Sequence, residues 1–239
     1  MKKHYYMVVD VETANDTEYP LVYDFGYAVT DRQGTIYEKG SFINRDVFFG
    51  MADIMRSAYY ANKVPTYLTE IYEGKHEVLS LYEIRKKVLE VFARYDIKAV
   101  LAYNASFDYR ALNITERYET KSKYRYFFPY GVEIWDIWNF ACNTICMQKG
   151  YAKFCLENGL VSPSGNISTS AESVYAYITK NAEFAEEHKG LADVLIETAI
   201  LAKCYATHKK AVREINRGCW RKPQPPKPIA KGVRKKKGS

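Results

Sequence analysis

The sequence lacks the cysteine spacing of a zinc site or of a disulfide framework. Its five cysteines are an odd number and include no Cys-x-x-Cys pair, the spacing on which most structural zinc sites depend. Cys142 and Cys146 lie one helical turn apart. No second pair accompanies them, so we interpret them as small apolar residues on a buried face. A reducing cytosol is the expected compartment.

A long apolar run is missing as well. The chain begins Met-Lys-Lys-His and passes into a short apolar run at 5–9. This run is too short for a signal-peptide core and far below the roughly 20 residues of a membrane span. With 47% apolar and 15% aromatic residues in 239, the chain can still bury a sizeable core. We therefore expect a soluble, cytoplasmic protein with no membrane partner, and the pattern does not indicate an oligomeric state.

Acidic residues are nearly absent from the C-terminal end. Residues 207–239 hold twelve Lys or Arg and a single acid, Glu214. This end therefore carries a net charge of +11. Because the whole chain has a net charge of +7, residues 1–206, which we call the body, carry −4. Four prolines between 223 and 228 block helix and sheet. The composition predicts a folded domain at 1–207 and a disordered basic tail at 208–239, which we interpret as a non-specific phosphate-binding segment.

The apolar pattern predicts an α/β domain. Short apolar runs indicate five strands, at 5–9, 22–30, 35–43, 98–103 and 132–135, of which the second and third form a hairpin. One helix follows a capping box that begins at Ser80, and another covers about 106–117. The strand-helix-strand order over 98–135 implies a parallel crossover. Helical patterns then run to 206, one of them after a second capping box at 169–172. A central five-stranded mixed sheet flanked by helices is expected.

Acidic side chains follow the ends of these strands. Asp10 and Glu12 are two apart at the end of the first strand, so both carboxylates face one side of the sheet. Asn104 follows the fourth strand, and Asp108 lies in the first turn of the next helix, where a carboxylate suits the helix dipole. Ligands of α/β sheets gather beyond strand ends. We therefore expect these acids to meet there.

A third motif opens the last long helix. His188 precedes this helix, and Asp193 lies in its first turn. A histidine with an ordinary pKa near about 6.5 can take a proton near neutral pH. Asp136, which follows the fifth strand, is interpreted as the N-cap of the next helix rather than as a catalytic residue.

In this order, Asp-x-Glu, Asn-x-x-x-Asp and His-x-x-x-x-Asp closely resemble the three motifs of the DEDDh group of DnaQ-like 3′-to-5′ exonucleases. The resemblance covers roughly residues 5–206, and Thr13, Phe107 and Ala192 also match the family pattern. Gly190 stands where many members carry Ala, and Asp-Phe-Gly at 24–26 replaces a commoner Ile-Gly pair. The resemblance implies a ribonuclease H-like fold and two Mg²⁺ or Mn²⁺ ions per active site.

The resemblance also implies a role for each acid. Asp10 would bridge both ions, Glu12 and Asp193 would complete the site of the nucleophilic water, and Asp108 would support the second ion mainly through water. His188 would act as the general base. Hard divalent cations of this kind prefer carboxylate and water oxygens, so four carboxylates suit a two-ion phosphodiesterase.

For the substrate, the resemblance implies a nucleic-acid 3′ end that is released as nucleoside monophosphates. Thr13 and Ala14 would contact the terminal nucleotide, and Asn104 and Phe107 would line the same cleft, although Phe107 is equally well explained as core packing. We expect single-stranded DNA as the substrate. The alternatives are an RNA-trimming exoribonuclease, an endonuclease of the same broad fold and a nucleic-acid-binding protein with little activity. Basic and aromatic residues interleaved at 121–128 indicate either a nucleic-acid groove or a solvated loop.

Overall fold

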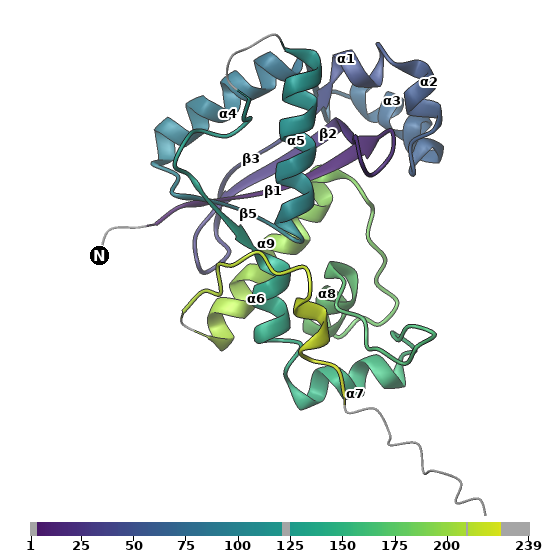
Figure 1. Ribbon diagram of the computed structural model, residues 1–239, viewed down its shortest axis with the longest axis vertical. Coiled ribbons are helices and arrows are strands. Elements are labelled where there is room, and N and C mark those ends of the chain that lie inside the picture. Colours follow the sequence, from purple (N-terminus) through teal and green to yellow (C-terminus); the bar gives the residue numbers. More distant parts are fainter. Residues whose placement is uncertain (1–3, 121–124, 209, 226–239) are drawn as a thin grey trace, which may run out of the picture.

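A mixed sheet organises the molecule, for which a computed structural model describes residues 4–120, 125–208 and 210–225. The described residues form six strands in the order β4-β3-β2-β1-β5-β6 (Figure 1). β1 and β2, and β2 and β3, pair antiparallel, whereas the three other pairs are parallel. The strands are β1 (Tyr6–Ala14), β2 (Leu21–Thr30), β3 (Ile36–Asn44), β4 (Glu77–Leu79), β5 (Ala99–Ala102) and β6 (Glu133–Asp136).

The α/β class, the hairpin and the parallel crossover predicted from the sequence are confirmed, but the expected count of five strands is wrong. The additional strand, β4, pairs parallel with the end of β3, from Phe42 to Asn44. It has only three residues, and none of them is fully buried. A strand this short shows no alternation, and no adjacent hairpin turn marks it, so the apolar pattern could not reveal it.

Helices occupy the connections of the sheet. Ser80 caps α4 through the predicted capping box with Glu83. At the second predicted box the N-cap is Ser170, one residue after the expected Thr169. In the described parts of the chain, no helix combines the length and apolar content that crossing a bilayer requires. The helices are α1 (Arg45–Phe48), α2 (Ala52–Arg56), the 3₁₀ turn η1 (Ala61–Lys63), α3 (Val64–Tyr72), α4 (Leu81–Tyr95), α5 (Ala105–Glu119), α6 (Ile137–Asn143), α7 (Lys149–Glu157), α8 (Ala171–Thr179), α9 (Gly190–Thr207) and the 3₁₀ turn η2 (Cys219–Arg221).

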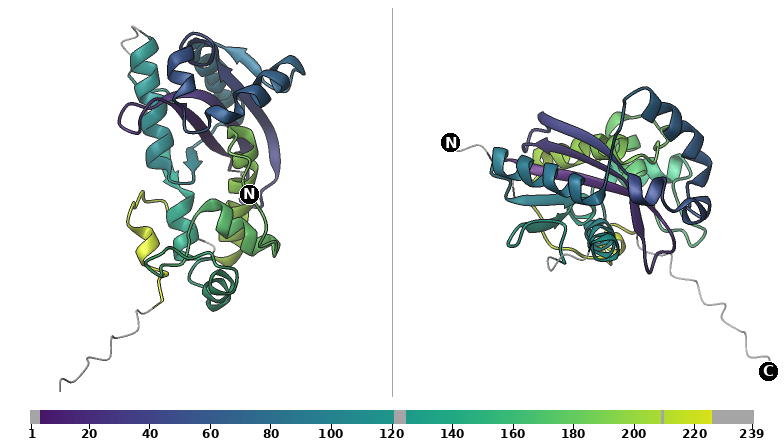
Figure 2. Two further views of the ribbon diagram at one scale, coloured as in Figure 1. Left: turned by 90° about the vertical axis from the view of Figure 1, so that its right-hand side faces the viewer. Right: turned by 90° about the horizontal axis from the view of Figure 1, so that it is seen from above.

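Alternate residues of β1 enter different hydrophobic cores. Tyr6 and Val8 pack with residues of α6, α8 and α9 on one face of the sheet. Met7, Val9 and Val11 pack with residues of α4 and α5 on the other face. Figures 1 and 2 show the strands between these two groups of helices. The period-2 geometry of the strand therefore decides that Asp10 and Glu12 face the side of α9.

A third cluster, which we call the small core, lies at the end of the hairpin beneath α1, α2 and α3. Tyr67 of α3 is fully buried in it and packs edge-on against Tyr23 of β2 at 5.7 Å between ring centroids. The segment 45–72 thus forms a unit with its own apolar contacts. The buried members of the small core are Ala14, Leu21, Tyr23, Ile43, Val47, Phe48, Met55, Ala58 and Tyr67.

Residues 210–225 of the predicted basic tail, which we call the C-terminal segment, pack on the rest of the chain. Cys219 is buried, the Asn139 amide donates to the Glu214 carbonyl at 2.8 Å, and the Gln224 side chain accepts from the Ile167 N–H at 2.8 Å. These contacts attach the segment to α6 and to the loop before α8 (Figure 1). Residues 226–239, and residues 121–124 of the basic and aromatic run, lie outside the described residues.

Candidate active site

The two acids of β1 stand beside a change of register. Asp10 pairs with Gly26 and Glu12 with Asp24, but Thr13 pairs with Val22, so one residue of β2 is left over. Such a bulge turns the following residues away from the face to which they would otherwise point. Beyond it, the side chain of Ala14 enters the small core.

Asp108 reaches β1 across the end of β5. Within β1, only residues 6–8 pair with β5. The N–H of Val11 therefore has no strand partner on that side. The Asp108 carboxylate accepts this N–H at 3.3 Å and is 4% exposed. Asn104 makes the sharp entry into α5 with φ of 68°, a left-handed conformation that asparagine tolerates better than most residues. The strand end and the helix start thus aim Asp108 at Asp10 and Glu12.

Asp136 has the structural role predicted for it. Its carboxylate caps α6 by accepting the Trp138 N–H at 3.0 Å. It also accepts the Asn104 N–H at 3.1 Å. One side chain therefore joins the turns that follow β5 and β6 and holds the entry to α5 in place.

α9 contributes two carboxylates. Asp193 lies in the first turn of the helix and Glu197 one turn later, so both project from the same face toward β1. Glu197 is 3% exposed and accepts the Tyr103 N–H at 3.0 Å, just beyond the end of β5. Glu197 was not among the residues predicted from the sequence, although its spacing of four from Asp193 was a readable signal.

The start of α9 is fixed against β2. The Asp24 carboxylate accepts the Gly190 N–H at 2.9 Å and the Tyr67 hydroxyl at 2.6 Å. A Cβ atom on Gly26 would lie 2.1 Å from the carbonyl carbon of Gly190. The two glycines therefore let helix and strand approach backbone to backbone.

Replacing Gly26 by alanine should displace the start of α9. Because the new methyl group meets the backbone of Gly190 and Leu191, we expect a loss of roughly 1–3 kcal/mol in the free energy of unfolding. We also expect a large loss of any activity that needs Asp193 in place. Urea denaturation and catalytic assays would measure both. Gly74→Ala is the control, because Gly74 has nothing within 4 Å and only a positive φ of 74°. Equal activity of the two variants would contradict this account.

His188 is held by residues of the segment that joins α2 to α3. Its ring stacks on Tyr60 at 4.5 Å between centroids. The Lys63 ammonium lies over the Tyr60 ring at 4.4 Å and contacts the carbonyl oxygens of Glu187 and His188. The His188 backbone is left-handed, with φ of 49°. Strain of this kind persists only where neighbouring contacts hold the residue in place.

The pKa of His188 suits a general base. Burial, and next the positive charge of Lys63, lower the pKa of His188 below its ordinary value. The imidazole is therefore neutral at neutral pH and can accept a proton. Its Nδ1 lies 3.8 Å from the Glu186 carboxylate, and burial raises the pKa of Glu186 to about 7.

The carboxylates share a poorly solvated space. Burial, followed by repulsion from Asp24, raises the pKa of Glu12 to about 9. Burial also raises the pKa of Asp108 and of Asp193 to about 7. Asp10 is partly exposed at the cavity surface but surrounded by protein, so desolvation and then repulsion from Glu197 raise its pKa well above the ordinary value. A divalent cation would remove this repulsion.

Stability without metal should fall as the pH rises. Glu12, Asp108 and Asp193 titrate near about 4 in an unfolded chain but at about 9, 7 and 7 here. The folded state therefore binds more protons over this interval. The stabilisation is complete below about pH 4 and is lost as the pH rises through 7 and 9. Thermal unfolding in EDTA at pH 5, 7 and 9 should show this decline, Mg²⁺ should reverse it, and Glu12→Gln should flatten it. A flat profile of the unsubstituted protein in EDTA would contradict the expectation.

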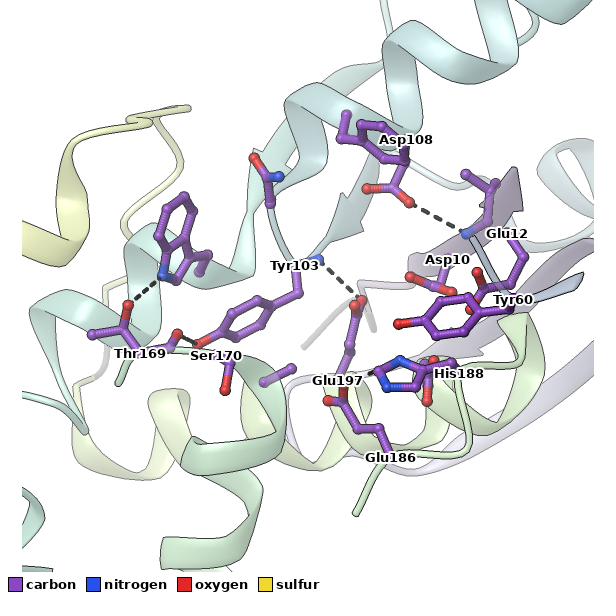
Figure 3. A pocket seen from close by; sticks show the side chains of 16 residues that line it. Asp10, Glu12, Tyr60, Tyr103, Asp108, Thr169, Ser170, Glu186, His188 and Glu197 are labelled. Carbon is purple, nitrogen blue, oxygen red and sulfur yellow. Dashed lines mark hydrogen bonds and ion pairs between the residues drawn. The ribbon is translucent and has the colours of Figure 1, made fainter. Parts of the chain in front are cut away.

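One cavity of about 480 Å³ collects the acids. Figure 3 shows Asp10, Glu12 and Asp108 on one side, with His188 and Glu186 opposite. Seven of the nine predicted site residues line it, whereas Thr13 and Ala14 are not among its described lining residues. The predicted residues present are Asp10, Glu12, Asn104, Phe107, Asp108, His188 and Asp193. The lining residues that sequence reasoning missed are Val11, Tyr60, Tyr103, Trp138, Thr169, Ser170, Ala171, Glu186 and Glu197.

The donor set fits a hard divalent cation. Glu12, His188 and Asp193 each offer a ligand atom, and these atoms lie within 4.8 Å of one another. The Asp193 Oδ1 atom is buried and, among the described residues, has no hydrogen-bond partner, so it is available as a ligand. Carboxylate oxygens prefer Mg²⁺ or Mn²⁺ over softer ions, so the carboxylates can serve as ligands while the His188 imidazole stays free.

The sheet order and the helices on its two faces define the α/β fold of the ribonuclease H-like exonucleases. In particular, the chain is similar to E. coli exonuclease I. The complex of that protein with a dA16 oligonucleotide superposes with a TM-score of 0.56 at 12% identity, over 87% of this chain and 42% of that one. Its complex with a 5cy-dA13 oligonucleotide gives 0.54 at 14%, over 87% and 41%.

A zinc-bound form of the E. coli exonuclease I complex with single-stranded DNA gives a TM-score of 0.52 at 14% identity, over 87% of this chain and 42% of that one. This chain thus spans less than half the length of exonuclease I. No protein-family model and no curated protein matches it. The likeness therefore shows a shared fold.

Proposed function

We propose that this protein is a metal-dependent 3′-to-5′ exonuclease that hydrolyses single-stranded DNA and releases nucleoside monophosphates. One observation carries the proposal. Four carboxylates and a histidine from three distant segments, Asp10, Glu12, Asp108, His188 and Asp193, line a single cavity. The single-stranded oligonucleotides in the exonuclease I structures support the choice of substrate.

The carboxylates would hold two Mg²⁺ or Mn²⁺ ions. Asp10 is central among them, since repulsion from Glu197, Asp108, Glu12 and Asp193 all contributes to its raised pKa; we assign it to both ions. Glu12 and Asp193 would complete the ion site nearer to His188, and Asp108 would support the other ion. Bound in pairs, such ions lower the pKa of a water molecule and stabilise the departing 3′ oxygen.

His188 would accept the proton of the attacking water. Its side chain lines the cavity, is one-third exposed and lies within 4.8 Å of donor atoms of Glu12 and Asp193. Stacking on Tyr60 fixes the plane of the ring. A base that is neutral at the working pH and already oriented needs little rearrangement to react.

Asn104 and Phe107 would seat the terminal nucleotide. Both line the cavity, and the Phe107 ring also packs beside the core under α5. An aromatic face can stack on any base, so this contact needs no particular sequence. We assign no nucleotide contact to Thr13 or Ala14, because β1 changes register before them.

The test is a digest of three 5′-labelled substrates, namely single-stranded DNA, duplex DNA and RNA of one sequence, in Mg²⁺ and in EDTA. We expect a ladder that shortens from the 3′ end of the single-stranded DNA in Mg²⁺ alone, and circular single-stranded DNA should remain intact. Cutting of the circle would indicate an endonuclease, and faster shortening of the RNA would indicate an RNA-trimming enzyme. No metal-dependent shortening of any substrate would overturn the proposal.

A further inference from the structure

A second cavity adjoins the acidic one. Its volume is about 600 Å³, and Trp138 and Thr169 line both cavities. The Trp138 indole donates to the Thr169 hydroxyl at 3.0 Å, which fixes this shared wall. Beyond the wall, the second cavity is lined by the loop 159–169, which is rich in serine, and by Trp220 of the C-terminal segment. The two cavities therefore adjoin at this wall, and we call them together the groove.

The C-terminal segment reaches both parts of this groove. The Arg217 guanidinium donates to the Ser106 hydroxyl at 3.0 Å, next to Phe107 of the acidic cavity. Three residues later, Trp220 lines the second cavity. Gln224 fixes the far end by accepting from the Ile167 N–H at 2.8 Å and donating to its carbonyl at 3.2 Å. In Figure 1 the yellow segment runs past α6 toward this loop.

The chemistry of the groove changes along its length. The end near Asp10 is acidic, whereas the C-terminal segment holds five Lys or Arg and one acid. Trp220 is partly exposed, and the Arg221 guanidinium lies 5.0 Å from its ring centroid. Serine residues of the loop 159–169 line the same cavity as Trp220. An aromatic face and hydroxyls that line a cavity, with cations beside them, suit the bases and phosphates of a single strand.

We propose that this part of the groove binds the nucleotides that precede the 3′ end of a single DNA strand. Trp220 stacks on a base, and Arg217 and Arg221 pair with phosphates. The inference rests on the proposed function and deepens it, because it places the body of the strand whose end lies among the carboxylates. It also explains how a body of net negative charge retains a polyanion: the cations come from the C-terminal segment.

Fluorescence anisotropy of a 5′-labelled dT20 oligonucleotide in EDTA tests this proposal without turnover. Trp220→Ala should weaken binding roughly tenfold, which is the usual effect of losing one stacked base. Arg217→Ala and Arg221→Ala should each reduce the slope of log Kd against log salt by about 0.7. Tyr72→Ala and Lys39→Ala are matched controls, since Tyr72 of α3 and Lys39 of β3 are exposed and lie outside the groove.

Two readouts keep the outcomes separate. Thiol labelling of Cys219, which is 2% exposed, reports whether the C-terminal segment stays packed in each variant. If Trp220→Ala fails to fold, the salt slopes of the two arginine variants decide. If the three variants bind dT20 with the same affinity and salt slope as the controls, the inference is overturned. That result would also be expected if the groove binds a protein partner instead of DNA. Weaker binding by these variants, with no shortening of DNA by the unsubstituted protein, would overturn the proposed function alone.

Discussion

Asp10→Asn should reduce hydrolysis of single-stranded DNA by roughly 10³-fold or more, because two bound ions supply several kcal/mol of transition-state stabilisation. Asparagine has nearly the same size, so the fold should be kept. Removing the charge also relieves the repulsion between Asp10 and Glu197 that contributes to the raised pKa of Asp10. The metal-free variant should therefore be at least as stable as the unsubstituted protein. Single-turnover rates, Mg²⁺ titration calorimetry and thermal unfolding measure the three effects.

The matched control for this variant is Asp53→Asn. Asp53 is an exposed acid of α2 that pairs with Arg56 on the same helix. It should keep both the rate and the Mg²⁺ affinity of the unsubstituted protein. An Asp10→Asn variant that cuts DNA as fast as Asp53→Asn would exclude Asp10 from the reaction. If Asp10→Asn lost activity only because it was unfolded, its thermal unfolding curve would show the loss of structure.

His188→Ala should lower the rate about 10²- to 10⁴-fold, the usual contribution of a general base, while Mg²⁺ binding is largely retained through the carboxylates. Because burial and Lys63 lower the pKa of His188 below 6.5, the rate of the unsubstituted protein should fall only as the pH drops through that lowered value. The variant should lose this dependence. Rates between pH 5 and 8 at saturating Mg²⁺ provide the measurement.

His208→Ala is the control for the His188→Ala variant. His208 follows α9, is exposed and lies outside the cavity. Its replacement should leave the pH profile unchanged. A His188→Ala variant with an unaltered rate, or with a lower rate but the same acid limb, would show that another group takes the proton. Glu186, whose pKa is raised to about 7, would then be the first residue to examine.

The positions of the acids could be predicted because local rules place them. Alternation along β1 sends Asp10 and Glu12 to one face, and the first turn of a helix holds Asp108 and Asp193. Each rule acts within a few residues, and the ends of adjacent strands then bring the four together. The alternation of side chains along a strand does not predict a change of register. The bulge after Glu12 depends on how β2 packs, so the displacement of Thr13 could not be read from β1 alone.

The residues around the acids were harder to predict because they depend on tertiary contacts. Tyr60 lies in a segment with no clear period, and only the packing of α3 against the hairpin brings it to His188. The C-terminal segment also depends on such contacts. Its Lys, Arg and Pro content is typical of disorder, yet buried Cys219 and the paired amide of Gln224 hold it in place. A few specific contacts thus outweigh average composition.

The contact between Tyr60 and His188 has a thermodynamic consequence. Tyr60 and Lys63 belong to the unit 45–72, whose apolar contacts are mainly those of the small core. Proteins open in parts as well as globally, and small units with few buried contacts open at a lower free energy than a central sheet. An opening confined to this unit would release the His188 ring while the carboxylates of β1, α5 and α9 keep their places. Under the proposed function, such an opened molecule would keep its metal ligands and lose its base before the whole chain unfolds.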